Sequence, residues 1–320
     1  MPDFQIQPIY STKRANSKDI PDYEVFLDYD ALREKYGEGV PVTVLDNGIA
    51  LNHVDLDKHI ISTNDHTGEG INAGDHGTHV AGIITSQHGL SKTTKLKSEK
   101  VLSTKGHGSI AWVLKGIEEA KRNGSTILQM SLGSDSPSQQ IEDALADFVS
   151  NPLHFAVIAS GNDSGLTDYP AMLADKYDGI ISVGAADIDK DGNVELAYFS
   201  SRGVVTVVYQ GVDVLSTIPN NKYSYKSGTS MAAPGVSAMI STAKKIYPEF
   251  TQNDFHTVAK MSTIDIDKKG IDKNSGYGFL IPMRFLSNVE CLRDGLPFSD
   301  EPIVKITVSL WSRLLCWIGF

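Results

Sequence analysis

Short apolar runs alternate with longer segments of helical periodicity through most of the chain. One such run, containing Val42, Val44 and Leu45, stops at the turn signal Asp46-Asn47-Gly48. Further apolar strand candidates cover residues 127–132, 155–159 and 180–184, and helical patterns cover residues 77–84, 110–121, 141–149 and 232–246. Strands that alternate with helices in this way predict an α/β fold, with a mostly parallel central sheet flanked by helices on both faces.

Length and composition are those of an ordinary globular protein. The 320 residues are 41% apolar and 21% charged, which suits one large domain or two small ones. The net charge of −10 argues against nucleic acid as a partner, because nucleic-acid binders normally carry a basic face. The two cysteines, Cys291 and Cys316, both lie near the C-terminus, so the main domain is not expected to depend on disulfides.

The N-terminal region, residues 1–38, is polar and irregular in its pattern. It has no unbroken apolar run of the kind that signal peptides carry, and no stretch of about 18 apolar residues occurs anywhere in the chain. We therefore expect a cytoplasmic protein, with secretion by a non-classical route as the alternative.

Three segments place a polar side chain at a strand end or a helix start, where sites form in parallel sheets. Asp46 follows the first strand, and taken alone it fits a plain turn residue equally well. The pair His76 and His79 suggests a metal site, but further ligands are missing nearby, so His76 is the functional candidate and His79 a packed helix residue. Ser230 begins the last of the predicted helices, where N–H groups favour an oxyanion, although a plain N-cap explains a lone serine as well.

Together, Asp46, His76 and Ser230 stand in the order Asp, His, Ser, which is the subtilisin order and differs from that of chymotrypsin and the α/β-hydrolases. The surrounding motifs are Leu-Asp-Asn-Gly, His-Gly-Thr-His-Val-Ala-Gly and Gly-Thr-Ser-Met-Ala-Ala-Pro. These motifs are highly specific. Over residues 41–282 the sequence resembles the subtilase (subtilisin-like, peptidase S8) family of serine proteases.

The resemblance implies a three-layer subtilisin-like fold for residues 39–285. An N-terminal extension, residues 1–38, would precede this peptidase domain, and a C-terminal extension, residues 286–320, would follow it. The resemblance also implies a serine endopeptidase that works through an acyl-enzyme and requires no cofactor for its chemistry.

The roles of four residues follow from the same resemblance. Ser230 would attack the peptide carbonyl while His76 takes its proton, and Asp46 would fix the tautomer of the imidazole. Asn162, in the segment Ser-Gly-Asn-Asp, matches the side chain that donates to the oxyanion.

Three further segments resemble substrate-binding parts of the family. Two of them would hold a peptide as an added strand: Gly106-His107-Gly108 and Ser131-Leu132-Gly133. Asp168, in Thr-Asp-Tyr-Pro, aligns with the floor of the first specificity pocket, where the family often has Gly. A carboxylate there would select Lys or Arg at the cleaved bond by charge pairing, and an exposed loop Asp is the alternative.

The sequence departs from the family pattern at several positions. Asn47 stands where Thr or Ser is usual, and an amide can still donate to the carboxylate. Gly235 stands where His is common, which we interpret as a packing variation. Asp55 matches an acidic residue that often ligates calcium, but the loop over residues 87–94 carries no carboxylate to complete such a site, so a structural calcium is not favoured.

The two ends of the chain leave alternatives open. The stretch Gln7-Pro-Ile-Tyr10 resembles the short N-terminal inhibitory segment of intracellular subtilisins, and a plain surface tether fits it equally well. Residues 303–320 are rich in Trp, Leu and Ile. They fit a peripheral membrane contact, or packing on the protease domain or on a partner subunit.

The expected partner is a peptide or protein substrate. Two rival functions are dedicated processing of one partner protein, and a binding protein on a subtilase fold that no longer cleaves. The complete set of Asp46, His76, Ser230 and Asn162 argues against the second rival.

Overall fold

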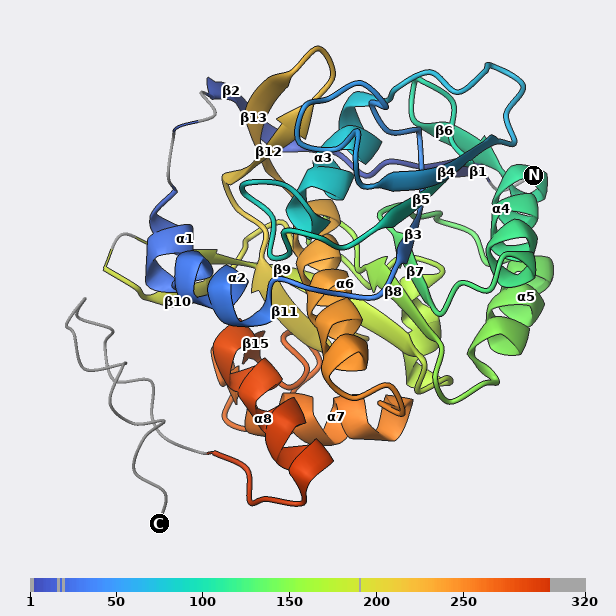
Figure 1. Ribbon diagram of the computed structural model, residues 1–320. Coiled ribbons are helices and arrows are strands. Elements are labelled where there is room, and N and C mark those ends of the chain that lie inside the picture. The colour runs from blue at the N-terminus through green and yellow to red at the C-terminus, as the bar shows by residue number, and fades with distance from the viewer. Residues whose placement is uncertain (1–2, 16–17, 19–20, 190, 300–320) are drawn as a thin grey trace.

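The computed structural model describes residues 3–15, 18, 21–189 and 191–299, and its centre is a large, mostly parallel sheet (Figure 1). The strands of this sheet are β3 (Val42–Asp46), β4 (Ile60–Asp65), β5 (Leu96–Lys100), β7 (Ile127–Met130), β8 (Phe155–Ala159), β9 (Ile180–Ile188), β10 (Val194–Leu196), β11 (Val207–Gln210), β14 (Thr263–Ile264) and β15 (Phe279–Leu280). Their order is β14-β15-β11-β9-β8-β7-β3-β5-β4, and β10 pairs with β9. Every pair from β4 across to β15 is parallel, whereas β14–β15 and β9–β10 are antiparallel.

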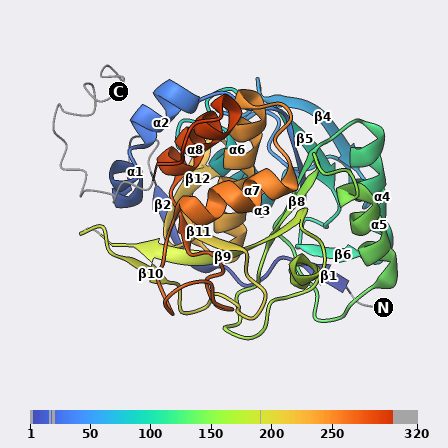
Figure 2. The same ribbon diagram turned by 90° about the horizontal axis from the view of Figure 1, so that it is seen from below.

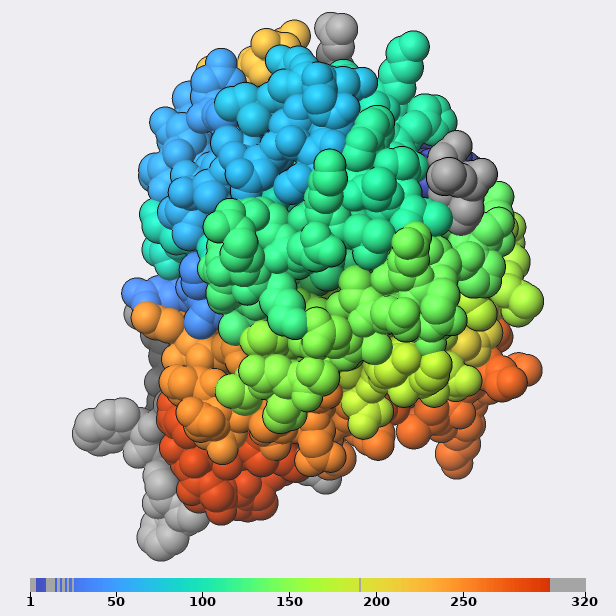
Figure 3. All heavy atoms as spheres, turned by 90° about the vertical axis from the view of Figure 1, so that its right-hand side faces the viewer, coloured from blue at the N-terminus to red at the C-terminus, as the bar shows by residue number. Residues whose placement is uncertain are grey.

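Helices cover both faces of the sheet (Figures 1 and 2). The helices α3 (Asp75–Ile84) and α6 (Thr229–Ile246) pack on one face, and α4 (Ile110–Arg122) and α5 (Gln139–Val149) on the other. Alternation within a strand divides the core: Val42 and Val44 face α3 and α6, whereas Leu45 packs with the residues of α4 and α5. Figure 3 views the molecule from the side that α4 and α5 cover. The predicted three-layer α/β fold is confirmed.

The N-terminal region carries regular structure that its polar pattern did not indicate. It includes β1 (Asp3–Gln5), β2 (Tyr10–Ala15), α1 (Asp22–Phe26) and α2 (Tyr29–Tyr36). Three tyrosines of the two helices, Tyr23, Tyr29 and Tyr36, are buried in the main core. A tyrosine breaks an apolar pattern in the sequence, but its ring buries like other aromatic rings once its hydroxyl finds a partner.

Two small sheets join this region to the peptidase domain. In the first, β1 pairs with β6 (His107–Ser109) in antiparallel orientation. In the second, the order is β12-β13-β2, with β12 (Val214–Ile218) and β13 (Lys222–Ser227) forming a hairpin. The N-terminal region is therefore paired with the peptidase domain through its backbone as well as through its tyrosines.

The C-terminal helices α7 (Gln252–Met261) and α8 (Pro282–Asp294) pack against one another, and α8 also packs against α6. Phe285 and Val289 are fully buried, so α8 continues the core across the predicted boundary at residue 285. The apolar tail over residues 303–320 lies outside the described residues. Within the described part of the chain, no helix has the length and apolar character that crossing a membrane requires.

Candidate active site

The predicted catalytic aspartate and histidine form a buried pair. Asp46 is the last residue of β3 and His76 the second residue of α3, and their exposed fractions are 1% and 3%. Nδ1 of His76 lies 2.9 Å from both carboxylate oxygens of Asp46. The backbone N–H of Asn47 donates to the same carboxylate at 2.7 Å. These contacts orient the imidazole so that its other nitrogen, Nε2, is left for a third group.

Asp46 and His76 can pair because the start of α3 lies very close to the backbone that follows β3. A Cβ atom at Gly77 would lie 2.6 Å from the carbonyl oxygen of Gly48 and 3.1 Å from Cβ of Asp46. The departure at Asn47 is accommodated differently from the prediction: its side-chain oxygen accepts from the N–H of Gly77 at 2.9 Å, and only its backbone N–H serves Asp46. Asn47 therefore ties the strand end to the start of α3.

Ser230 lies in the first turn of α6, where backbone N–H groups have no partner within the helix. Its Oγ is buried and lacks a hydrogen-bond partner in the described part of the chain, and the same holds for Nε2 of His76. Ser131 fixes the start of α6, because its Oγ donates to the carbonyl oxygen of Ser230 at 2.9 Å. A serine hydroxyl and an imidazole nitrogen thus stand ready at the N-terminal ends of two helices that pack together.

Asn162 is held with its amide group in a defined orientation. Its side-chain oxygen accepts from the N–H and the hydroxyl of Thr229, both at 2.8 Å. The NH₂ group then faces the opposite way and donates to the carbonyl oxygen of Pro8 at 3.1 Å. Thr229, one residue before Ser230, received no role in the sequence reading although it stands in the Gly-Thr-Ser motif.

The chain's own N-terminal segment lies between the two predicted substrate-binding edges. Phe4 stands opposite Gly108, and Ile6 donates its N–H to the carbonyl oxygen of Gly106 at 3.0 Å. On the other side, Gln5 and Gly133 exchange N–H···O bonds of 2.9 and 3.0 Å. Residues 3–8 thus run as an added strand, which is how an extended peptide binds to a sheet edge.

Next to Gly133, a polar side chain of this strand lies near a buried carboxylate. Gln7 is 7% exposed, and neither its Nε2 nor Oδ2 of Asp168 has a hydrogen-bond partner in the described residues. Both atoms border Gly133, where an added Cβ would lie 2.8 Å from the first and 3.0 Å from the second. Burial raises the pKa of Asp168 to about 7, with smaller contributions from the charges of Asp163 and Asp135.

Two lysines near the site were missed by the sequence reading. Lys226 is buried in β13 and forms an ion pair with Asp75, the neighbour of His76. Lys100 ends β5 and donates to the carbonyl oxygens of Asn47 and Leu102 at 3.1 and 2.9 Å. A lysine in a strand gives no sign in the sequence of whether it faces solvent or the core.

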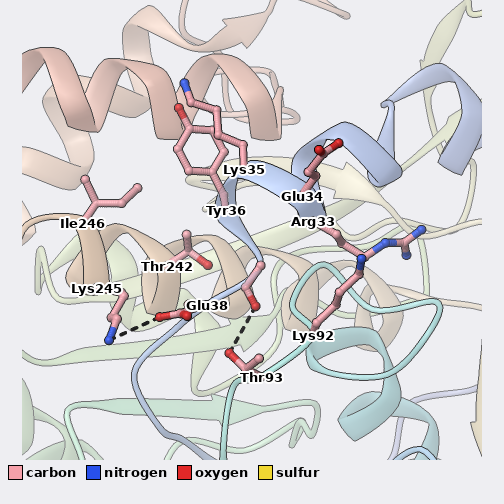
Figure 4. Close-up of a pocket in the computed structure, with 11 residues that line it drawn as sticks. Arg33, Glu34, Lys35, Tyr36, Glu38, Lys92, Thr93, Thr242, Lys245 and Ile246 are labelled. Carbon is pink, nitrogen blue, oxygen red and sulfur yellow. Dashed lines mark hydrogen bonds and ion pairs between the residues drawn. The ribbon is translucent and has the colours of Figure 1, made fainter.

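Two cavities differ in their relation to this site. One, of about 290 Å³, is lined by residues of the N-terminal segment together with His76, Asp75 and Lys226. The other, of about 420 Å³, lies between the ends of α2 and α6 and contains none of the predicted site residues (Figure 4). His76, the candidate base, therefore borders the cavity that the N-terminal segment helps to line.

The predicted His79 assignment is confirmed. Its ring is fully buried, and its Nε2 pairs with the carbonyl oxygen of Ser224 at 2.9 Å. Burial, followed by the nearby charge of Lys226, holds the pKa of His79 well below its ordinary value. No group of three or more His, Cys, Asp or Glu side chains suited to a metal occurs within the described residues.

A buried Asp–His pair and an unpartnered serine at a helix start, in the chain order Asp, His, Ser on a parallel sheet, define the class of subtilisin-like serine proteases. The sequence profile of the subtilase family matches residues 37–278. The chain therefore belongs to the subtilase family. It is a serine protease, as the sequence predicted.

Known relatives agree with this assignment. Subtilisin DY of Bacillus licheniformis is 36% identical over 227 residues, which are 66% of this chain and 79% of that protein. An intracellular serine protease of Paenibacillus polymyxa is 30% identical over 279 residues, 79% of this chain and 82% of that protein. A thermophilic serine proteinase of Bacillus sp. (strain AK1) is 32% identical over 255 residues, 74% of this chain but only 61% of that protein.

Proposed function

We propose that Asp46, His76 and Ser230 are the catalytic triad of an endopeptidase and that Asn162 is its oxyanion donor. The observation that carries the proposal is the hydrogen bond from the Asn162 amide to a carbonyl oxygen of a peptide lying in the cleft. Ser230 attacks the substrate carbonyl and His76 takes the hydroxyl proton, while Asp46 stabilises the imidazolium that forms. Asn162 and the backbone N–H of Ser230 meet the oxyanion, and water then hydrolyses the acyl-enzyme.

Fluorophosphonate labelling tests this proposal. The probe should attach to Ser230 in the wild-type chain, and the Ser230→Ala variant should neither label nor cleave peptides. A wild-type chain that folds, is freed of its N-terminal segment and still takes no label would favour the rival function, a binding protein on the subtilase fold. Cleavage by Ser230→Ala at an unreduced rate would end the triad assignment.

We further propose that residues 3–8 inhibit the enzyme. The side chain of Gln7 lies beside Gly133 and Asp168, yet the carbonyl that meets Asn162 belongs to the next residue, Pro8. The side-chain register and the carbonyl register thus differ by one residue. Cleavage requires the side chain at Asp168 and the carbonyl at Asn162 to belong to the same residue. Gln7 meets only the first condition and Pro8 only the second. The segment therefore occupies the cleft without being cut.

Asp168 supports a preference for Lys or Arg before the cleaved bond. Its carboxylate oxygen is buried without a partner beneath the strand that occupies the cleft. A guanidinium or ammonium group in this pocket would supply the missing donor and offset the cost of burying the charge. The glutamine of the inhibitory segment is neutral, so a basic substrate would compete for the pocket with an interaction that the segment lacks.

A restrictive cleft also favours dedicated processing over general degradation. Phe4 is fully buried, three residues before Gln7, so the enzyme would select a substrate at two positions.

The similarity to a protein named intracellular serine protease supports our proposal of a cytoplasmic location.

A further inference from the structure

Asp55, which lies between β3 and β4, is next to the loop between α3 and β5 and already accepts hydrogen bonds. Asp55 accepts from the hydroxyl of Tyr223 at 2.9 Å and from the N–H of Gln87 at 3.5 Å. A calcium ion needs six to eight oxygen ligands with free lone pairs. Donors that point their hydrogens at the carboxylate occupy the place of such an ion, so the surroundings of Asp55 do not fit calcium.

A protein cation meets the carbonyl oxygens of the same loop from the other side. Arg33 extends from α2, and its side chain is only 7% exposed. Its Nη1 donates to the carbonyl oxygens of Gln87 and Gly89 at 2.8 and 3.2 Å. Figure 4 shows the guanidinium of Arg33 directed away from the neighbouring pocket. One buried positive charge therefore gathers two loop carbonyls, as a bound metal ion would.

The charge of Arg33 is balanced from α1 and α2. Nη2 of Arg33 lies 3.6 Å from Oε2 of Glu24 and donates to Asp30 at 3.0 Å. The other oxygen of Glu24 lies 3.0 Å from Nδ1 of His88, so the carboxylate also contacts the loop directly. Glu24 and His88 are both buried, with exposed side-chain fractions of 5% and 6%. A buried ion pair is stable only when its remaining hydrogen-bonding groups are satisfied, and here the loop satisfies them.

We propose that the guanidinium of Arg33, balanced by Glu24, takes the place of a structural cation at the loop of residues 86–91. The loop follows directly on α3, the helix that carries His76, so this internal cation fixes the far end of that helix. Two consequences follow. The fold does not depend on calcium, and α1 and α2 belong to the active enzyme. With the inhibition proposed above for residues 3–8, it follows that a shortened, active chain must still contain Glu24.

The first test compares calcium with a chelator, using the full chain with Ser230→Ala so that self-digestion plays no part. We expect the same Tm in millimolar calcium and in excess EDTA. A structural site filled far above its Kd would instead add several degrees to the Tm, because ligands of the native state stabilise it by mass action. A Tm that rises and saturates with calcium would overturn the proposal, and this outcome is independent of whether Ser230 is catalytic.

The second test removes the internal cation. Arg33→Met should lower the Tm by roughly 5–10 °C, because it leaves the buried carboxylate of Glu24 without its guanidinium partner and with His88 alone beside it. Lys35→Met is the matched control on the same helix; its pair with Glu290 is half exposed, so the Tm should change by less than about 2 °C. Amide hydrogen exchange over residues 86–91 should accelerate in Arg33→Met only, and added guanidinium ion at millimolar concentration should slow it again.

Equal Tm values and equal exchange for Arg33→Met and Lys35→Met would refute the role of Arg33. Should Arg33→Met fail to fold, Glu24→Gln provides the second variant, because it keeps the shape of the side chain and removes only the charge. It should accelerate exchange over residues 86–91 while leaving β7 and β8 protected. Unchanged exchange in that loop would equally overturn the proposal.

Discussion

The side-chain amide of Asn162 donates to the carbonyl oxygen of Pro8 at 3.1 Å, which joins the proposed oxyanion donor to the chain's own N-terminal segment. Thr229 holds the other end of the Asn162 amide through two hydrogen bonds. The two bonds to Thr229 do not involve the peptide, so we expect the donor to keep its orientation when the segment leaves. An electrostatic device of this kind is effective because it needs no reorganisation during the reaction.

Removing the segment that Asn162 holds should activate the enzyme. A chain lacking residues 1–15 loses β1 and β2 but retains α1 and α2, so it should fold and show a higher initial rate on a peptide substrate. The full-length chain should show a lag, or a lower rate, under the same conditions. A synthetic peptide of residues 1–15 should inhibit the shortened enzyme competitively. Equal initial rates for both chains would show that the segment is only a tether.

Much of this arrangement could be read from the sequence, because the catalytic candidates stand in contiguous motifs at the ends of clear strands and helices. We could identify Asp46, His76 and Ser230 as candidates from their order in the chain and from the motifs around them. The pairing of residues 3–5 with β6 could not be found in this way, since three residues carry no periodicity and the partner strand decides their conformation. The contacts of Arg33 with Gln87 and Gly89 were equally hidden, because they join segments far apart in the sequence.

Asn162→Ala should reduce kcat and leave KM nearly unchanged. The lost donor acts on the oxyanion more than on the ground-state carbonyl, and the loss of such a donor in subtilisin itself costs about 2.7–4 kcal/mol of barrier. Steady-state kinetics on the shortened enzyme would measure the effect. Thr229→Ala is a useful companion variant, because it removes one of the two bonds that orient the amide and should cause a smaller loss of kcat. A change in KM alone would contradict the oxyanion role.

Gly235→Ala should destabilise the fold by about 1–3 kcal/mol, the usual cost of overpacking a core. A Cβ atom there would lie 2.4 Å from Cε1 of Tyr209, whose hydroxyl is bonded to that of Tyr29 at 2.8 Å. The ring is thus held against the helix and cannot move aside freely. Urea unfolding of Gly235→Ala, Tyr209→Leu and the double variant would measure the coupling. Additive effects would show that the two residues do not compete for the same space.

Asp168 should make the preference for basic residues depend on pH. Because burial raises its pKa to about 7, the carboxyl group is mostly neutral below that pH and charged above it. The attraction for Lys or Arg should therefore grow as the pH rises through this value. The ratio of kcat/KM for a peptide with Arg before the cleaved bond to that for the same peptide with Leu is the right measurement, because the titration of the triad affects both peptides and cancels.

Asp168→Asn keeps the size of the side chain and removes the charge, so it is the matched control. The Arg-to-Leu ratio should fall about tenfold or more at pH 8, as expected when a buried charge-assisted hydrogen bond of roughly 1.5–3 kcal/mol is weakened. At pH 5 the two enzymes should discriminate alike, since the protonated Asp168 of the wild type is then as neutral as the Asn of the variant. A ratio near one in the wild-type enzyme at pH 8, or a ratio that Asp168→Asn leaves unchanged, would show that this carboxylate does not select the substrate.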